Sequence, residues 1–262
     1  MALRDLRPTV RRRISRISSY VIFFAIVVVL AFIGDWKLIT RNFFNLTVAG
    51  KLFPEVFRAA GNTILYTILS FSVGLFFAVV LALMKMSKGP FKWFAIAFIE
   101  LFRGLPALLT IFIMAFAVPI AFKIKVAGVY MGLVGLVLVT AAYTAEIVRA
   151  GIAAVPKGQR EAARSLGMSQ MTTNLTVILP QAFRIVIPPL TNEIVMLLKD
   201  TSLLFIAGAT KFTKELTTFG RDGNSTHGNA TPLVVVAVFY LVITIPLTYL
   251  VARLEKRMAV KQ

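Results

Sequence analysis

Uncharged apolar stretches recur along the chain, and five of them are long enough to cross a membrane as helices. A bilayer core of about 30 Å needs roughly 20 residues at about 1.5 Å of rise per residue, so runs of ~18 or more apolar residues predict spans. The third run extends back toward Trp93, because residues 93–99 are also apolar. The five predicted spans are residues 17–34, 61–84, 104–122 and 126–145, and one within 224–252.

The distribution of Lys and Arg predicts a sixth crossing that is not itself uniformly apolar. Cationic residues mark the cytoplasmic side of a membrane protein, and here they are dense in residues 1–16 and again after residue 252. Two cytoplasmic ends require an even number of crossings, so we expect a hidden span near residues 182–207. With it, 18 Lys and Arg fall in cytoplasmic segments and nine in outer loops. The sequence therefore predicts an all-α polytopic membrane protein with six transmembrane helices.

The hidden span carries polar groups that lipid cannot solvate, so neighbouring helices or a wet cavity must surround it. Pro188 and Pro189 remove two backbone donors, which predicts a helix break, and broken helices often form solute sites. Glu193, Lys199 and Asp200 alternatively only cap helix ends and pair with one another. The residues predicted to form a solute cavity or gate come from this span and the third one: Arg103, Glu193, Lys199, Asp200 and Ser202.

The amino-acid composition excludes several classes of function. Hydrophobic residues make up 58% of the 262 residues and charged residues only 15%, which is the profile of a polytopic membrane protein. Without cysteine there is no disulfide or thiolate chemistry, and one histidine, His227, cannot build a multi-histidine metal site. We therefore predict neither a catalytic centre nor a metal site. The net charge of +18 is explained by cytoplasmic loops and does not indicate nucleic-acid binding.

The order of these features predicts a modular organisation. The first apolar run follows a basic arm and could be a signal peptide, but residues 35–37 lack a small-x-small cleavage site, so we favour an uncleaved anchor. The loop between the fourth span and the hidden span is cytoplasmic in the six-span topology. The predicted parts are a basic cytoplasmic arm (1–16), an N-terminal transmembrane helix (17–34), an external segment (35–60), a core (61–252) with a cytoplasmic loop (150–180), and a cytoplasmic tail (253–262).

The cytoplasmic loop contains a short polar segment that differs from everything around it. It begins near Pro156 and Lys157, includes Glu161-Ala162-Ala163, and reaches Gly167, where a left-handed residue would end a helix. Val177-Ile178-Leu179-Pro180 follows. Two alanines let a helix backbone approach a partner groove closely, and a glutamate can pair with a basic residue there. The segment therefore predicts a docking helix, although an ordinary solvated helix is the simpler alternative.

This pattern resembles the EAA loop of importer-type ATP-binding-cassette permeases, with Val177 where that family usually has Ile. Further motifs resemble the polar amino-acid uptake branch of the family (histidine, glutamine, glutamate or arginine type), and the resemblance covers roughly residues 60–257. The branch usually has five spans, so the N-terminal helix here is an addition. The matching runs are Glu100–Pro106, Ala142–Arg149, Val155–Gln159, Leu179–Ala182, Pro188–Pro189 and Leu198–Leu203.

The resemblance implies the transmembrane subunit of a type I importer in a bacterial cytoplasmic membrane. It implies a second permease subunit (identical or homologous), a cytoplasmic ATPase dimer, an extracytoplasmic solute-binding protein and a polar or charged amino acid as cargo. The chain has no Gly-x-x-x-x-Gly-Lys-Ser/Thr phosphate loop, so ATP and Mg²⁺ are expected on the ATPase. The residues implied in ATPase coupling are Lys157, Glu161, Ala162, Ala163 and Gly167.

Two other classes of function remain open at this stage. An ion-coupled secondary transporter of a small polar solute could use Glu193, Lys199 and Asp200 as its coupling site, and it would need no docking helix. A membrane-embedded enzyme is disfavoured, because the one histidine lies in an outer loop and no span carries closely spaced paired carboxylates. The expected mechanism is alternating access driven by the ATPase partner.

Overall fold

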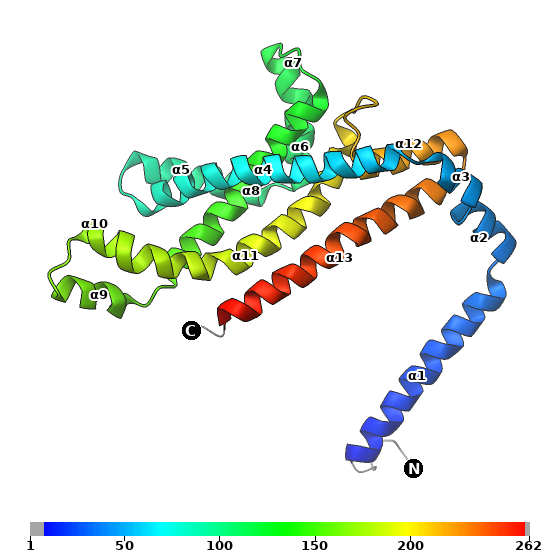
Figure 1. Cartoon of the computed structure of the whole chain (residues 1–262), viewed down its shortest axis with the longest axis horizontal. Coiled ribbons are helices and arrows are strands. Elements are labelled where there is room, and N and C mark those ends of the chain that lie inside the picture. Colours follow the sequence, from blue (N-terminus) through cyan, green and yellow to red (C-terminus); the bar gives the residue numbers. More distant parts are fainter. Residues whose placement is uncertain (1–7, 260–262) are drawn as a thin grey trace. The chain divides into compact units, whose positions relative to one another are not determined.

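The computed structural model describes residues 8–259, and every regular element in that range is a helix (Figure 1). The all-α class predicted from the sequence is therefore confirmed for the described residues. The chain divides into two compact units, residues 1–46 and residues 47–262, and each is described by itself.

The N-terminal unit consists of a long apolar helix and a short amphipathic one. α1 (Pro8–Ile33) contains a stretch apolar enough to span a membrane, Arg16–Ile33, which agrees with the predicted first span. The basic arm predicted at 1–16 is helical from Pro8 onward, while Arg4 and Arg7 lie outside the described residues. α2 (Trp36–Phe43) follows, so the predicted external segment begins with a helix.

The core is organised around two helices that pack closely along their length. After α3 (Leu46–Lys51), α4 (Glu55–Met86) and α8 (Gly128–Ala153) are both apolar enough to span a membrane. Gly74 of α4 makes the close approach possible, because a Cβ atom there would lie 2.8 Å from Cγ2 of Thr140 on α8. α4 starts at Glu55, before residue 61, where the sequence places the start of the second span.

The predicted third span is not one straight helix. α5 (Pro90–Gly104) and a second helical stretch, Ala107–Phe122, are bent by 104° at a short break, and together they are apolar enough for one broken span or a re-entrant loop. Pro106 lies at the break and lacks the amide donor that would continue α5. The second stretch runs through α6 (Ala107–Phe112), a π-helical turn, and α7 (Val118–Phe122).

The predicted break at Pro188–Pro189 is wrong, because α11 (Leu179–Asp200) continues through both prolines. The Thr191 hydroxyl donates to the Pro188 carbonyl at 2.7 Å, in the helical turn that follows the two prolines. The α-helical geometry ends instead at Asp200, and a 3₁₀ turn follows at Thr201–Ile206. Its last turns are held in the core, since Leu197 and Leu204 pack in one buried cluster with Ile111 and Leu136.

The number of spans is established only in part. Among the described residues, four helices are long and apolar enough to cross a membrane, or five counting the bent pair as one span. α11 is not among them, although its 22 residues extend about 33 Å at ~1.5 Å per residue. The six-span count therefore stays a prediction that depends on α11.

The segment that holds His227, which the sequence predicts as an outer loop, contains a helix, α12 (Leu216–His227). Glu215 caps it, because its carboxylate accepts hydrogen bonds from the backbone N–H groups of Thr217 and Thr218 at 2.5 and 2.6 Å. α13 (Thr231–Ala259) is the last apolar helix. Its span starts at Thr231, within the range 224–252 in which the sequence predicts the last span. Lys261 of the basic tail lies outside the described residues.

Candidate functional site

The polar segment of the loop that the sequence predicts to be cytoplasmic forms a helix with well-defined ends. α9 (Lys157–Ser165) starts after Pro156, as the sequence predicts. At its other end Gly167 has a φ of 79°, the left-handed conformation that glycine adopts without steric penalty. The backbone N–H groups of Gly167 and Met168 donate to the carbonyls of Arg164 and Ala163 at 3.0 and 3.1 Å, which is a Schellman motif. The predicted left-handed helix end is confirmed.

The side chains of α9 divide into one buried contact and an exposed face. Ala163 is buried, whereas Lys157, Glu161 and Ala162 are exposed. Beyond Gly167, α10 (Gln170–Thr173) and a π-helical turn at Asn174–Ile178 lead into α11. α9 therefore rests on the following segment through Ala163 and presents its polar face outward.

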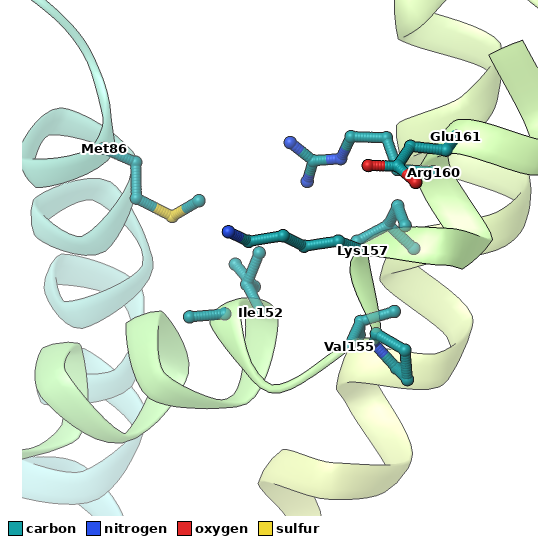
Figure 2. Close-up of a pocket in the computed structure, with 9 residues that line it drawn as sticks. Met86, Ile152, Val155, Lys157, Arg160 and Glu161 are labelled. Atoms are coloured by element: carbon teal, nitrogen blue, oxygen red, sulfur yellow. The ribbon is translucent and has the colours of Figure 1, made fainter.

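A recess of about 400 Å³ lies beside the start of α9. Lys157, Arg160 and Glu161 contribute its charged side, and Met86 of α4 and Ile152 of α8 contribute apolar atoms. Figure 2 shows the Lys157 side chain extending from α9 toward Met86 across this recess. The ends of α4 and α8 therefore border the same recess as the start of the predicted docking helix.

Two apolar side chains at the tip of this loop were not among the residues selected from the sequence. Leu166, at the end of α9, is 84% exposed, and Met171 on α10 is 66% exposed. In a chain this rich in apolar residues, neither side chain carries a compositional signal. The available signal is positional, because an apolar residue directly after a polar helix that is predicted to be cytoplasmic would have no lipid to contact. Leu166 and Met171 form what we call the apolar tip.

The predicted solute residues lie mainly on α11. Glu193 and Asp200 are both half-buried and seven residues apart, which places them on nearly the same face of the helix. Lys199 is exposed, and Ser202 lies in the 3₁₀ turn after α11. Two carboxylates on one face supply acceptors for a cationic group such as an ammonium.

The structure does not bring the predicted cation of the third span into this group. Arg103 lies in the last turn of α5 and is exposed, with its guanidinium carbon 5.7 Å from the ring centroid of Tyr143 on α8. Within the described residues, no ion pair joins Arg103, Glu193, Lys199 or Asp200 to one another. In this conformation α11 therefore presents its acidic face without a bound counter-charge from these residues.

At the opposite end of the core from α9, α4 holds the loop that precedes α12 (Figure 1). The side-chain amide of Asn62 donates to the carbonyls of Phe212 and Lys214, both at 2.8 Å. The Tyr66 hydroxyl donates to the Thr213 carbonyl at 2.9 Å. We refer to residues 212–214, held in this way, as the anchored loop.

A recess of about 510 Å³ lies next to the anchored loop, and its charged lining includes Arg58, Lys211, Lys214 and Glu55. Lys214 also lies 2.7 Å from Asp222 of α12. Burial raises the pKa of Glu215, the cap of α12, although hydrogen bonds from Thr218 and Thr217 oppose the rise. This end of the core is therefore a charged surface, in which Lys211 pairs with Glu55 and Lys214 with Asp222.

Comparison with known proteins places this arrangement in a family. A family model described as binding-protein-dependent transport system inner membrane component matches residues 72–260. A probable glutamine ABC transporter permease protein of Bacillus subtilis is 37% identical over 215 residues, which are 82% of this chain and 98% of that protein. The glutamine transport system permease protein of Escherichia coli is 32% identical over 225 residues, 83% of this chain and 99% of that protein.

Solved structures agree with the sequence relatives. An amino acid ABC transporter crystallised with histidines has a TM-score of 0.75 and 32% identity, covering 81% of this chain and 98% of that one. The MetNI methionine ABC transporter, in an inward-facing conformation, has a TM-score of 0.63 over 78% of this chain and 95% of that one. Its 19% identity supports the fold alone.

Proposed function

Since the chain belongs to the family of binding-protein-dependent transport system inner membrane components, we propose that it is the permease subunit of an ATP-binding-cassette importer for a polar or charged amino acid. The relatives named for glutamine transport, together with the acidic face of α11, support this cargo class. The observation that carries the proposal is α9, a capped polar helix with an exposed apolar tip at one end of an apolar bundle.

In the proposed complex, α9 docks into a groove of a separate ATPase subunit. The surface of α9 that contacts the ATPase includes Lys157, Glu161 and Ala162, and Gly167 fixes the end of the helix. The side chains of the apolar tip pack into the groove. Ala163 faces the permease itself, because it is buried against the following segment, and so supports the contact from behind. ATP and Mg²⁺ bind to the ATPase dimer, and this chain contributes no nucleotide site.

The proposed topology follows from the same placement. With α9 in the cytoplasm, the opposite end of the core, with Arg58, Lys211 and the anchored loop, faces the extracytoplasmic solute-binding protein. α11 supplies the sixth crossing in this scheme. Both chain ends then lie on the cytoplasmic side of the bacterial cytoplasmic membrane. Its polar residues are then shielded by neighbouring helices and by a second permease subunit, identical or homologous.

The proposed mechanism is alternating access. Closure of the ATPase dimer draws the two α9 helices together and opens the outer side, so that a loaded binding protein releases its solute to the path beside α11. Glu193 or Asp200 accepts the ammonium of the solute, while Arg103 or Lys199 supplies donors for its carboxylate. Hydrolysis returns the pair to the inward-facing state.

Reconstitution tests this function against ion-coupled transport. The permease, its ATPase and its binding protein are placed in proteoliposomes, and uptake of a panel of radiolabelled amino acids is followed with and without internal ATP. We expect uptake only when ATP, ATPase and binding protein are all present. Uptake driven by a sodium or proton gradient in vesicles that lack the ATPase would contradict the proposal and establish a secondary transporter.

A further inference from the structure

An ion-paired cluster joins three helices at the end of the core that carries α9. The Lys85 ammonium at the end of α4 donates to Glu146 of α8 at 3.0 Å, and it lies 3.7 Å from the carboxylate of Glu100 on α5. Arg149, one turn after Glu146, donates to the same carboxylate through Nε at 2.9 Å and also through Nη2. We call Lys85, Glu100, Glu146 and Arg149 the ionic cluster.

The contacts within the ionic cluster are unequal. The side chains of Lys85 and Glu146 are only 17% and 22% exposed, so their attraction is weakly screened by solvent. Glu100 is 65% exposed and sits at a longer distance, which makes its pair with Lys85 a weak surface interaction. Glu146 has two cationic partners, so its carboxylate is the centre of the cluster. Two cations and two anions leave no net charge that would attract a ligand.

The cluster is continuous with the recess beside α9. Met86, the residue after Lys85, and Ile152, less than two turns after Glu146, both line that recess together with Lys157. On the other side of the cluster, the three helices are already packed through a buried apolar group. Its members are Ala78, Leu81, Ala95, Ile99, Ala141 and Ala145. The ionic cluster therefore fastens the ends of α4, α5 and α8 close to the recess that α4 and α8 share with the start of α9.

We propose that Glu146 is a positioning residue for energy coupling, which fastens α4 and α8 together so that a displacement of α9 moves them as one body. This inference rests on the proposed function. Without the carboxylate, α9 can still bind the ATPase and follow its closure, but the ends of α4 and α8 separate and the movement does not reach the solute path. ATP is then hydrolysed without a matching uptake of solute.

The test compares three neutral substitutions in the complete reconstituted complex: Glu146→Gln, Lys85→Met and Glu100→Gln. Binding-protein-stimulated ATP hydrolysis and solute uptake are measured on the same proteoliposomes and divided by the amount of assembled complex. We expect Glu146→Gln to lower the solute moved per ATP by roughly tenfold, because it leaves two partly buried cations uncompensated. Lys85→Met should also lower this ratio, because it removes the ion pair between α4 and α8 while Arg149 and Glu146 pair only within α8, and Glu100→Gln should match the unsubstituted complex.

A covalent replacement separates positioning from a general loss of stability. The chain has no cysteine, so Lys85→Cys with Glu146→Cys can be joined by a flexible bis-maleimide reagent. Joined helices should regain solute uptake per ATP without the ionic cluster, whereas the same variant treated with a monofunctional maleimide should stay uncoupled.

Two results would overturn the proposal. One is a normal ratio of solute to ATP in assembled Glu146→Gln complexes, and the other is failure of the cross-link to raise that ratio. Absence of ATP-dependent uptake in the unsubstituted complex would instead contradict the proposed function itself, so the two failures are distinguishable.

Discussion

Replacing Leu166 by alanine isolates the contribution of the apolar tip to ATPase binding. The side chain is 84% exposed in the isolated chain, so the substitution removes little that the permease uses for its own folding. Leucine to alanine deletes three carbons, worth about 0.8 kcal/mol each when they are buried. If the ATPase groove covers nearly all the exposed surface, the loss is about 2 kcal/mol, or roughly 30-fold in the dissociation constant.

The assay measures binding of the purified ATPase to the permease in lipid nanodiscs, with thermal stability of the free permease recorded in parallel. Leu46 provides a matched control, because it is 85% exposed and its replacement by alanine makes the same chemical change far from α9 in the sequence. We expect Leu166→Ala to weaken ATPase binding by about 30-fold without changing the melting temperature, and Leu46→Ala to change neither. Equal ATPase affinity for the two variants would refute the assignment of Leu166 to the contact.

Three further expectations concern the docking helix, the topology and the solute path. Glu161→Lys should lower uptake per ATP while membrane insertion stays normal, and Gly167→Val should do the same, because a β-branched residue is strained at positive φ by about 1–2 kcal/mol. Insertion is checked by membrane fractionation, and a normal uptake ratio in both variants would exclude the docking role. Single cysteines at Ser169 and Ser225 should differ in intact cells, with an impermeant thiol reagent labelling only position 225; labelling of 169 would overturn the six-span topology. Glu193→Gln should alter selectivity among amino acids in competition assays while stimulated ATP hydrolysis is retained, whereas unchanged selectivity with poor assembly would make Glu193 a structural residue.

The elements that could be predicted were those whose cause is local. A proline before α9 and a glycine after it fix both helix ends within a few residues, and the structure has both ends where the sequence predicts them. The long apolar helices α1, α4, α8 and α13 follow in the same way from length and hydropathy. α12 was missed because its signal is a single cap, Glu215, in a Gly- and Thr-rich segment without apolar periodicity.

The effect of a proline on a helix could not be predicted from the local sequence alone. Pro106 interrupts the third span, whereas Pro188 and Pro189 lie within a continuous helix. The difference arises from context, since α11 is held in the core where Leu197 packs in a buried cluster with Ile111 of α6 and Leu136 of α8. These contacts cannot be recognised before the tertiary structure is known. The same holds for the ionic cluster, whose members come from three helices far apart in the sequence.

The backbone of the anchored loop is held by hydrogen bonds that do not involve the side chains of that loop. Asn62 and Tyr66 bind only main-chain carbonyls of residues 212–214, and every amino acid carries such a carbonyl. These three hydrogen bonds therefore do not depend on which side chains occupy positions 212–214. A population of permeases could alter which binding protein it accepts through substitutions here, with the helices that carry the solute left untouched. Partner choice and transport are in this way open to selection independently of each other.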